Sequence, residues 1–210
     1  MVVIDVLRAF TVTAYALAGG AEEVIYVADL ERARRVAAGI PGAVLCAEVD
    51  GLPVAGVAIS NSPTMVVAAD LAGRILVQRS SAGVQALAAA APTASGLLAA
   101  SLVVAGATAA RIRKLDPPLL TLLASRPDHH EDAACSAYLE ALLEGSRPDL
   151  EALLAPLRAS ERHAEFARGG WPGFPATDLE LSLLADRFDF ALPVETGEHG
   201  HLRVRLARSS

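Results

Sequence analysis

The stretch VVIDVLRAF, Val2 to Phe10, opens the chain with a run of apolar residues that is typical of a buried strand. We expect a strand over Val2–Val6 and a helix over Ala9–Ala18, which two glycines would close. Asp5 and Arg8 are the charged residues of the stretch, and they lie where the strand gives way to the helix. Because α/β proteins bind ligands at the carboxyl ends of their strands, the stretch predicts a fold class and part of a site together.

Short apolar runs alternate with alanine-rich segments through the following part of the chain. We expect further strands at Glu23–Ala28, Ala43–Ala47, Arg74–Gln78, Ala94–Ala99 and Leu119–Ala124, and helices at Leu30–Ala38, from Pro63, at Ala82–Ala91, Leu102–Lys114 and Glu131–Leu143. Between the third strand and Pro63 we expect a loop, Glu48–Ser60. Repeated strand–helix–strand units with continuous apolar strands indicate a mostly parallel sheet covered on both faces.

The pattern changes after Gly145. We expect helices at Pro148–Arg158, Glu161–Arg168 and Thr177–Asp186, a turn-rich loop at Gly169–Pro175, and a hairpin of Leu192–Glu195 with His201–Ala207 around Thr196–Gly200. The hairpin would add antiparallel edge strands, which makes the expected sheet mixed. We expect residues 146–210 to pack on this sheet, so that residues 1–210 form a single domain.

Composition excludes several classes of protein. The chain has 210 residues, of which 53% are hydrophobic and 20% charged, so it can bury a large core and carries no signature of disorder. Its net charge of −6 and the lack of a Lys/Arg cluster argue against binding of nucleic acid. No basic region precedes the first apolar run, so we expect a cytoplasmic protein without a signal peptide.

Two further features of the sequence have simple interpretations. The segment between Arg79 and Arg111 contains no charged residue, but Pro92 and Gly96 interrupt it, so we expect buried soluble elements and no membrane span. The two cysteines form no CxxC motif, and we expect them to be reduced.

Polar side chains recur where expected strands pass into helices. Carboxylates there are oxygen ligands suited to Mg²⁺, namely Asp5, Glu48, Glu131 and Asp132. Two arginines, Arg8 and Arg79, could clamp a phosphate or carboxylate. Hydroxyl, amide and glycine groups at two helix starts could bind an anion, namely Asn61, Ser62, Ser80, Ser81 and Gly83. Together these groups suggest a divalent metal and a phosphate-bearing small molecule.

Each of these residues also has a purely structural interpretation. Asp5 and the Asn61-Ser62-Pro63 segment are good helix caps, and acidic residues such as Glu131 favour any helix start through its dipole. Cys135 is a candidate nucleophile, although a cysteine among alanines is more often a core residue. His129-His130 is a weak metal motif, and His199 with His201 offers a distant zinc alternative. The coincidence of many such groups is what favours a site.

Four blocks of the sequence resemble the 2-phosphosulfolactate phosphatase family. They are DVLRA at Asp5–Ala9, the acidic glycine-containing loop from Glu48 through Gly51 to Asn61-Ser62-Pro63, the EDAAC segment from Glu131 to Cys135, and the stretch from Asp178 to Pro193 with Asp186 between. The blocks keep their order and spacing over most of the chain. Each is short, but together they form a fairly specific match.

The resemblance implies a three-layer α/β/α sandwich with a mixed, mostly parallel sheet. It implies Mg²⁺-dependent hydrolysis of 2-phospho-3-sulfolactate to 3-sulfolactate and phosphate, a step toward coenzyme M. The family motif positions fall on Asp5, Arg8, Glu48, Asn61, Ser62, Glu131 and Asp132. As catalytic residues we expect Asp5, Arg8 and Asp132, with water or Asp5 favoured over Cys135 as the nucleophile.

The chain also departs from the family pattern. Ala82 and Val84 stand where the family usually has Asn and Thr, with Arg79 as a substitute anion contact, and Ser101-Leu102-Val103-Val104 replaces a later Asn-containing block. Relatives normally carry a strand and loop before DVLRA, so either that piece is lacking or the start is misplaced. These departures leave two alternatives open: a phosphatase of another 2-phospho-hydroxy acid, or an inactive anion-binding homologue. The sequence leaves self-association open.

Overall fold

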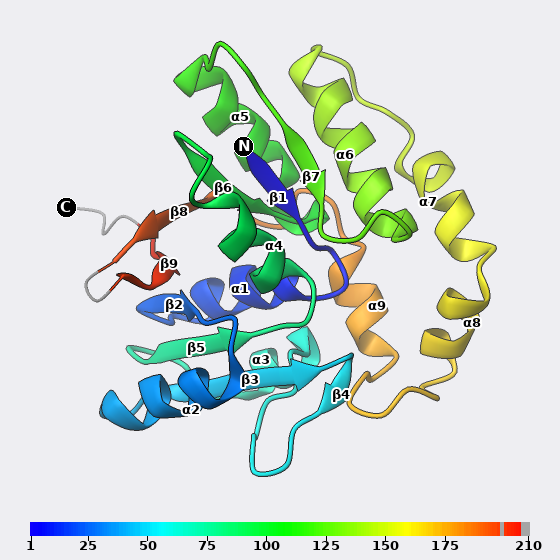
Figure 1. Ribbon diagram of the computed structural model, residues 1–210. Coiled ribbons are helices and arrows are strands. Elements are labelled where there is room, and N and C mark those ends of the chain that lie inside the picture. Colours follow the sequence, from blue (N-terminus) through cyan, green and yellow to red (C-terminus); the bar gives the residue numbers. More distant parts are fainter. Residues whose placement is uncertain (198–199, 207–210) are drawn as a thin grey trace.

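The computed structural model describes residues 1–197 and 200–206 (Figure 1). In this part of the chain, one nine-stranded sheet has the order β4-β3-β5-β2-β9-β8-β6-β1-β7. The strands are β1 (Val2–Ile4), β2 (Glu23–Tyr26), β3 (Val44–Val49), β4 (Leu52–Pro53), β5 (Ile75–Arg79), β6 (Leu97–Ala100), β7 (Leu122–Ala124), β8 (Leu192–Thr196) and β9 (Leu202–Val204). The helices are α1 (Ala9–Ala18), α2 (Leu30–Gly39), α3 (Pro63–Ala68), α4 (Gly83–Ala90), α5 (Ala105–Leu115), α6 (His130–Leu143), α7 (Leu150–Arg158), α8 (Glu161–Ala167) and α9 (Thr177–Ser182).

The sheet contains two parallel groups of strands that are joined through antiparallel pairings, which confirms the expectation of a mixed sheet. Strands β3, β5 and β2 are parallel neighbours, and so are β6, β1 and β7. All three residues of β1 are fully buried, and β1 lies between β6 and β7 with Val2 opposite Leu98 and Leu122. The apolar run at the start of the chain is therefore an interior strand, as its composition predicts.

The late hairpin lies in the middle of the sheet, so the prediction of antiparallel edge strands is wrong. Strand β9 pairs with β2, where Val204 faces Val24, and β8 pairs with β6, where Leu192 faces Ala99. Leu192 and Val204 are fully buried. The hairpin joins the two parallel groups by supplying each with its missing hydrogen-bond partner. Residues 198–199 of the hairpin turn and residue 207 of the expected last strand lie outside the described residues.

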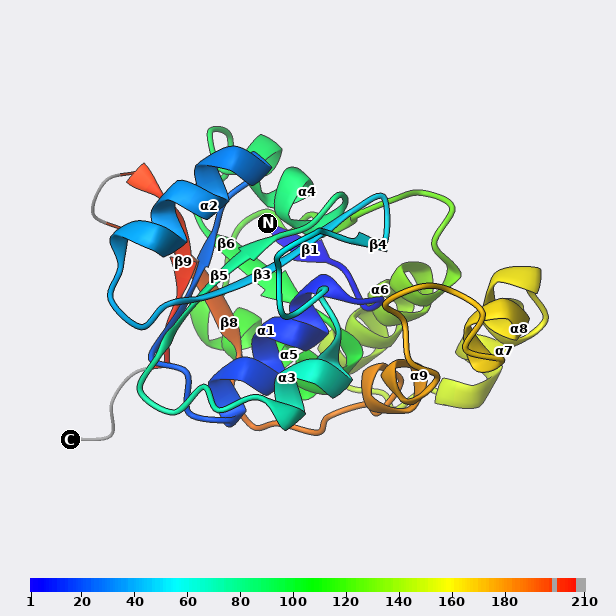
Figure 2. The ribbon, with the colours of Figure 1, turned by 90° about the horizontal axis from the view of Figure 1, so that it is seen from below.

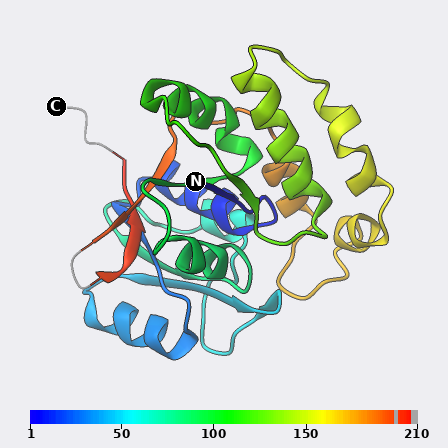
Figure 3. The ribbon, with the colours of Figure 1, turned by 45° about the horizontal axis from the view of Figure 1, so that its top comes forward.

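Helices cover both faces of the sheet, as expected for three layers. One face packs on α1, α3 and α4, and nine of the ten residues of α1 are buried there. The other face packs on α2 at one end and on α5 and α6 at the other (Figures 1 and 3). Helices α7 and α8 lie at the periphery beside α6, and Figure 2 shows them extending away from the sheet.

The carboxyl ends of the two parallel groups of strands lie on the same side of the molecule, although the strand order alone would place them on opposite sides. Three antiparallel pairings separate β2 from β6, so a flat sheet would point the groups in opposite directions. Sheets twist by about 20–25° per strand pair, and this rotation accumulates over the intervening strands. The ends of β1 and β3 consequently run toward the same side of the molecule, where α9 lies (Figure 1). There the backbone amide of Gly83 donates to Asp5 Oδ2 at 2.7 Å.

Three expected elements differ in detail. The loop that begins at Glu48 contains β4, which turns back onto β3. The helix expected from Leu102 begins with a 3-10 turn, Leu102–Val104. The helix from Thr177 ends at Ser182 and not at Asp186. The carboxylate of Asp186 instead accepts from the Gly106 amide at 2.6 Å at the start of α5. Among the described residues, no helix is long and apolar enough to cross a bilayer.

Candidate active site

A cavity of about 280 Å³ opens where the strand ends converge. Its wall comes from the segments that follow β1, β3, β5 and β7, and from α8 with the loop after it. The lining residues are Asp5, Leu7, Arg8, Glu48, Asp50, Gly51, Asn61, Ser80, Ser81, Ala82, Arg126, His129, Arg162, Phe166, Trp171 and Phe174. Most polar groups that the strand-end argument selects from the sequence therefore share one cavity.

Two buried aspartates hold the segments of the site together. Asp5 Oδ1 accepts from the amide of Ala9 at 3.0 Å, and Asp5 Oδ2 accepts from the amide of Gly83 at 2.7 Å. Asp132 Oδ1 accepts from the amide of Val6 at 2.8 Å. Asp5 is 2% exposed and Asp132 is 0% exposed. Asp5 is not the N-cap residue of α1, which is Arg8, but its side chain accepts from the first amide of α1 and from the first amide of α4, so it ties the two helices together.

Burial disfavours the ionised form of both aspartates. Loss of solvent raises the pKa of Asp5 to about 6, although the amides of Ala9 and Gly83 oppose the change. Burial also raises the pKa of Asp132 well above its ordinary value, and the nearby charge of Asp5 adds to this effect. A divalent cation close to both carboxylates would offset the cost, so their environment fits a metal site.

The raised pKa of Asp5 predicts a pH-dependent loss of stability. The folded protein binds this proton more tightly than the unfolded chain does, because the folded pKa of about 6 exceeds the reference value of 3.8. The free energy of unfolding should therefore fall by about 1–3 kcal/mol through this group as the pH rises from about 4 to about 6. Denaturant unfolding in EDTA at pH 4.5 and 7.5 should show a smaller fall for Asp5→Asn than for the wild type. Equal falls would contradict the prediction.

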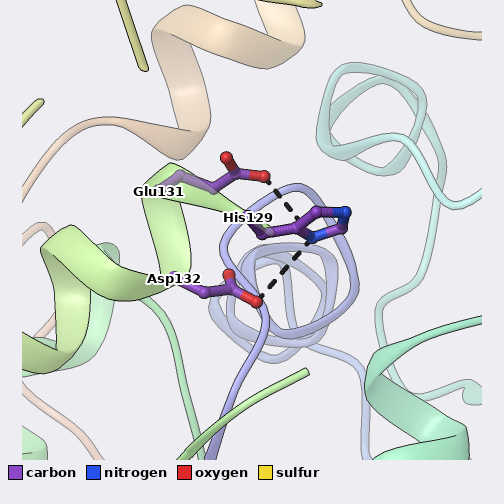
Figure 4. A group of neighbouring side chains, drawn as sticks. All are labelled: His129, Glu131 and Asp132. Atoms are coloured by element: carbon purple, nitrogen blue, oxygen red, sulfur yellow. Dashed lines mark ion pairs between the residues drawn. The ribbon is translucent and has the colours of Figure 1, made fainter. Parts of the chain in front are cut away.

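A compact group at the start of α6 has the ligand set for a metal. Ligand atoms of His129, Glu131 and Asp132 all lie within 4.8 Å of one another, and Figure 4 shows the three side chains converging. The Nδ1 atom of His129 is 3.7 Å from Glu131 Oε1 and 3.9 Å from Asp132 Oδ2. Among the described residues, His129 Nδ1 and Glu131 Oε2 are buried without a hydrogen-bond partner. A buried nitrogen without a partner beside two carboxylates fits a bound cation.

The surroundings of His129 favour the neutral imidazole that a metal ligand requires. Burial lowers the pKa of His129, and the nearby charge of Arg162 lowers it further. The imidazole is therefore mainly neutral near pH 7, which is the form that ligates a metal. The sequence offers this histidine as a weak signal only, and the geometry gives it more weight than its motif does.

The four carboxylates predicted as metal ligands come together only in part. Glu131 and Asp132 belong to the compact group, whereas Glu48 lies across the cavity. Glu48 Oε2 accepts from the amide of Gly51 at 2.6 Å and from the hydroxyl of Ser81 at 3.1 Å, and Glu48 Oε1 accepts from the Ser81 amide. Glu48 thus organises the two loops that follow β3 and β5.

Arg8 lies in the cavity wall with its guanidinium held from three sides. Its Nη1 donates to Asp178 Oδ2 at 2.9 Å and to the carbonyl of Gly173 at 2.6 Å. Its guanidinium carbon lies 4.2 Å from the ring centre of Phe174. Arg8 is 4% exposed. These contacts fix the orientation of a permanent positive charge in the lining of the cavity.

Three of the predicted anion contacts have other partners. Arg79 donates to the Glu48 carbonyl, to the Ala28 carbonyl at 3.3 Å and to Ser81 Oγ at 2.8 Å, and it does not line the cavity. Arg79 thus braces the loops after β3 and β5, and its contact with an anion stays a prediction. The Gly83 amide is used by Asp5, as described above.

Ser62 is likewise away from the cavity, and its hydroxyl donates to Asp178 Oδ1 at 2.7 Å while it caps α3. Asn61, Ser80 and Ser81 do line the cavity. Asn61 has a left-handed backbone with φ of 56°, and its side-chain oxygen accepts from Gln78 at 2.8 Å. Asn61, Ser80 and Ser81 are therefore the predicted anion contacts that line the cavity together with Arg8, and the Ser81 hydroxyl is already bonded to Glu48 and Arg79.

A sequence model of the family described as 2-phosphosulpholactate phosphatase matches residues 1–163. The chain belongs to this family. The matched range contains Asp5, Arg8, the compact group at α6 and Arg162, and it ends before the loop with Trp171 and Phe174. The resemblance seen in the short motifs therefore extends over more than half of the chain.

Individual relatives carry the same description. The chain is 33% identical over 147 residues to a protein of Bacillus subtilis named "Probable 2-phosphosulfolactate phosphatase", which covers 69% of this chain and 64% of the relative. A protein of the same name from Synechococcus sp. is 31% identical over 187 residues, covering 86% of this chain and 75% of the relative. One from Thermus thermophilus is 38% identical over 115 residues, covering 55% and 48%. The chain thus spans less than two thirds of the Bacillus and Thermus relatives.

The cavity of this 2-phosphosulpholactate phosphatase family member contains residues that the motifs do not predict. Arg162 and Phe166 come from α8, and Trp171 and Phe174 come from the loop after it. Phe166 and Phe174 stack with ring centres 3.9 Å apart, and Trp171 meets Phe166 edge to face. The sequence signal that could have found them is the only tryptophan of the chain, placed in a loop where no core element needs it.

Cys135 lies on the buried face of α6, which argues against its role as the nucleophile. It is fully buried among apolar residues and does not line the cavity. Burial raises the pKa of its thiol well above the ordinary value, and the charge of Asp132 adds to the effect. A buried neutral thiol is a small apolar side chain and not a nucleophile.

The substitution Cys135→Ala is therefore expected to leave turnover within about twofold of wild type and to lower the free energy of unfolding by about 1 kcal/mol, because it removes one buried sulfur atom. Phosphate release and denaturant unfolding measure the two effects. A loss of turnover by a hundredfold in a folded variant would restore Cys135 to the mechanism.

The positions that depart from the family pattern, and the histidines of the zinc alternative, lie in different parts of the fold. Ala82 lines the cavity where the family usually has Asn, whereas Val84 is buried in the core. Of the zinc alternative, His199 lies outside the described residues, and His201 borders two other cavities beside α2. The departure that faces the cavity is therefore Ala82.

Proposed function

We propose that this protein is a cytoplasmic Mg²⁺-dependent phosphatase that hydrolyses 2-phospho-3-sulfolactate to 3-sulfolactate and phosphate, a step toward coenzyme M. One observation carries the proposal: a single cavity is lined by three arginines, Arg8, Arg126 and Arg162, and by His129. The ligand atoms of His129 lie within 4.8 Å of those of the buried Glu131 and Asp132, in a group suited to a cation. The proposed substrate carries three acidic groups, a phosphate, a carboxylate and a sulfonate. A chain of net charge −6 needs such local cations to bind it.

The metal would be held by His129, Glu131 and Asp132, with Asp5 near the same point. When bound, Mg²⁺ would neutralise charge on the transferring phosphoryl group. The chain's own contribution is position and charge. Arg8 is fixed by Asp178 and Phe174 and would orient an anionic group of the substrate, and the hydroxyls of Ser80 and Ser81 lie in the same wall.

Attack by water is favoured over attack by a protein group. The amides of Ala9 and Gly83 hold both oxygens of Asp5 in the cavity wall, and each oxygen keeps a second lone pair. A raised pKa of about 6 makes the carboxylate a better proton acceptor near neutral pH, so we assign it to water and not to covalent attack. The proposed roles are therefore proton acceptor for Asp5, substrate positioning for Arg8, and metal binding for Asp132.

Ala82 supports a second candidate, a phosphatase of another 2-phospho-hydroxy acid. It replaces a polar family residue in the wall of the cavity, so one contact to the substrate is missing. An anion-binding homologue that has lost the chemistry would share this feature. Self-association stays a prediction.

A substrate panel tests the proposal and separates these candidates. Phosphate release with Mg²⁺ would be compared for 2-phospho-3-sulfolactate, 2-phospholactate and 4-nitrophenyl phosphate. We expect kcat/KM for the sulfonated substrate to exceed that for 2-phospholactate by at least about tenfold, since one charge-assisted contact contributes about 1.5–3 kcal/mol. Equal or higher values for 2-phospholactate would favour the second candidate. Binding of sulfolactate without turnover of any ester would favour an inactive homologue.

A further inference from the structure

Arg162 lines the cavity and forms an ion pair with Glu131, a residue of the candidate metal site. Its Nη1 lies 2.5 Å from Glu131 Oε1, and its side chain is 31% exposed while that of Glu131 is fully buried. The residue comes from α8, at the periphery of the fold, and not from the end of a strand. A partly exposed cation thus reaches inward to neutralise a buried carboxylate.

The contact competes with a bound metal. Glu131 Oε1 is both the partner of Arg162 and the atom 3.7 Å from His129 Nδ1, while Glu131 Oε2 is buried without a partner. A divalent cation placed between these atoms would stand next to the guanidinium. Two cations at contact distance repel each other strongly in a partly buried site. One of them must therefore withdraw when the other binds.

Arg162 is free to be the one that withdraws. Apart from Glu131, its described side-chain contact is the ring of Phe166, whose centre is 5.1 Å from the guanidinium carbon. Phe166 is itself fixed by stacking on Phe174. The guanidinium can therefore leave the carboxylate and remain over a fixed ring, inside the wall of the same cavity.

We propose that Arg162 is a placeholder for the metal: it neutralises Glu131 in the metal-free protein, and cation binding releases it to bind an anionic group of the substrate. The metal thus prepares the anion site, which would couple the two ligands positively. This inference rests on the proposed function, because it assigns a regulatory contact within the same site.

The test measures Mg²⁺ affinity, for which Trp171 provides a probe. It is the only tryptophan of the chain and lines the cavity, so its fluorescence can follow titration of the metal-free protein at pH 8. We expect Arg162→Ala to bind Mg²⁺ at least about fivefold more tightly than the wild type, because the competing cation is gone. Its KM for 2-phospho-3-sulfolactate should rise at least about tenfold, because a charged contact is lost.

Two further variants keep the test decisive. Arg162→Gln retains a hydrogen-bond donor for Glu131 and removes the charge, so it should also bind Mg²⁺ more tightly even if the alanine variant folds poorly. Arg158→Ala removes an arginine of α7 that pairs with Glu151 at the surface, and it should change neither the Mg²⁺ affinity nor the KM.

The coupling between metal and anion can be measured directly. In the wild type, saturating Mg²⁺ should increase the affinity for inorganic phosphate, and this increase should vanish in Arg162→Gln.

The outcomes distinguish this inference from the proposed function. If the wild type hydrolyses the substrate with Mg²⁺ but both Arg162 variants bind the metal as weakly as the wild type or more weakly, the placeholder role is wrong and the function stands. If the wild type neither binds Mg²⁺ nor releases phosphate, both are wrong.

Discussion

The substitution Arg8→Ala is expected to destabilise the protein by about 3–5 kcal/mol, because it leaves a buried carboxylate without its cation. Arg8 and Asp178 form an ion pair of 2.9 Å in which both side chains are buried. The same change removes the donor to the Gly173 carbonyl and the contact with Phe174. Denaturant unfolding should therefore show a markedly lower midpoint, and the remaining folded protein should lack turnover.

The exposed pair of Arg158 with Glu151 provides the matched control. Both of its side chains are largely exposed, and such pairs contribute less than about 1 kcal/mol, so Arg158→Ala should leave stability nearly unchanged. Arg8→Lys keeps the charge but cannot stack or donate as a planar fork, so it should restore part of the stability and little of the turnover. Equal stability for Arg8→Ala and Arg158→Ala would contradict the role given to the buried pair.

The substitution Glu131→Gln is expected to abolish the response to Mg²⁺ while the fold persists. Glutamine has the same shape, and its carbonyl oxygen can keep the contact with Arg162. It removes the charge that a cation needs, so phosphate release should fall by about 10²–10³, since metal charge stabilisation contributes several kcal/mol. The increase in melting temperature that Mg²⁺ gives the wild type should disappear in the variant.

Glu140→Gln is the control for this experiment, because Glu140 is exposed on the same helix and does not line the cavity. It should retain both turnover and the thermal response to Mg²⁺. If Glu131→Gln kept its thermal response, the metal would have to bind elsewhere, and the group at the start of α6 would not be the site.

Much of the fold follows from local patterns. The buried run Val2–Ile4 and the helix Ala9–Ala18 lie where the alternation of apolar runs and helical segments predicts them. The position of the late hairpin does not follow, because the pattern of a strand reports burial and not its neighbours in the sheet. Only the unpaired sides of β2 and β6 in the folded chain explain why Leu192 and Val204 lie at the centre.

The site could be predicted where residues act from the ends of strands. Asp5, Arg8, Asp132 and the serines after β5 carry such a signal, and the rule that strand ends meet brings most of them into one cavity. Arg162 and Phe174 carry no such signal, because they reach the cavity from a peripheral helix and a loop. Arg79 carries the same signal but does not line the cavity, because a side chain that follows a strand can equally brace the neighbouring loop, as its bonds to the Glu48 and Ala28 carbonyls do.

Steady-state release of phosphate from 2-phospho-3-sulfolactate, with Mg²⁺ and after its removal by EDTA, tests the proposed activity most directly. We expect turnover with Mg²⁺, a loss of at least about a hundredfold in EDTA, and recovery when Mg²⁺ is added back. Turnover that is unchanged in EDTA, or no release of phosphate in protein whose fold and Mg²⁺ binding are intact, would contradict the function proposed for this cavity.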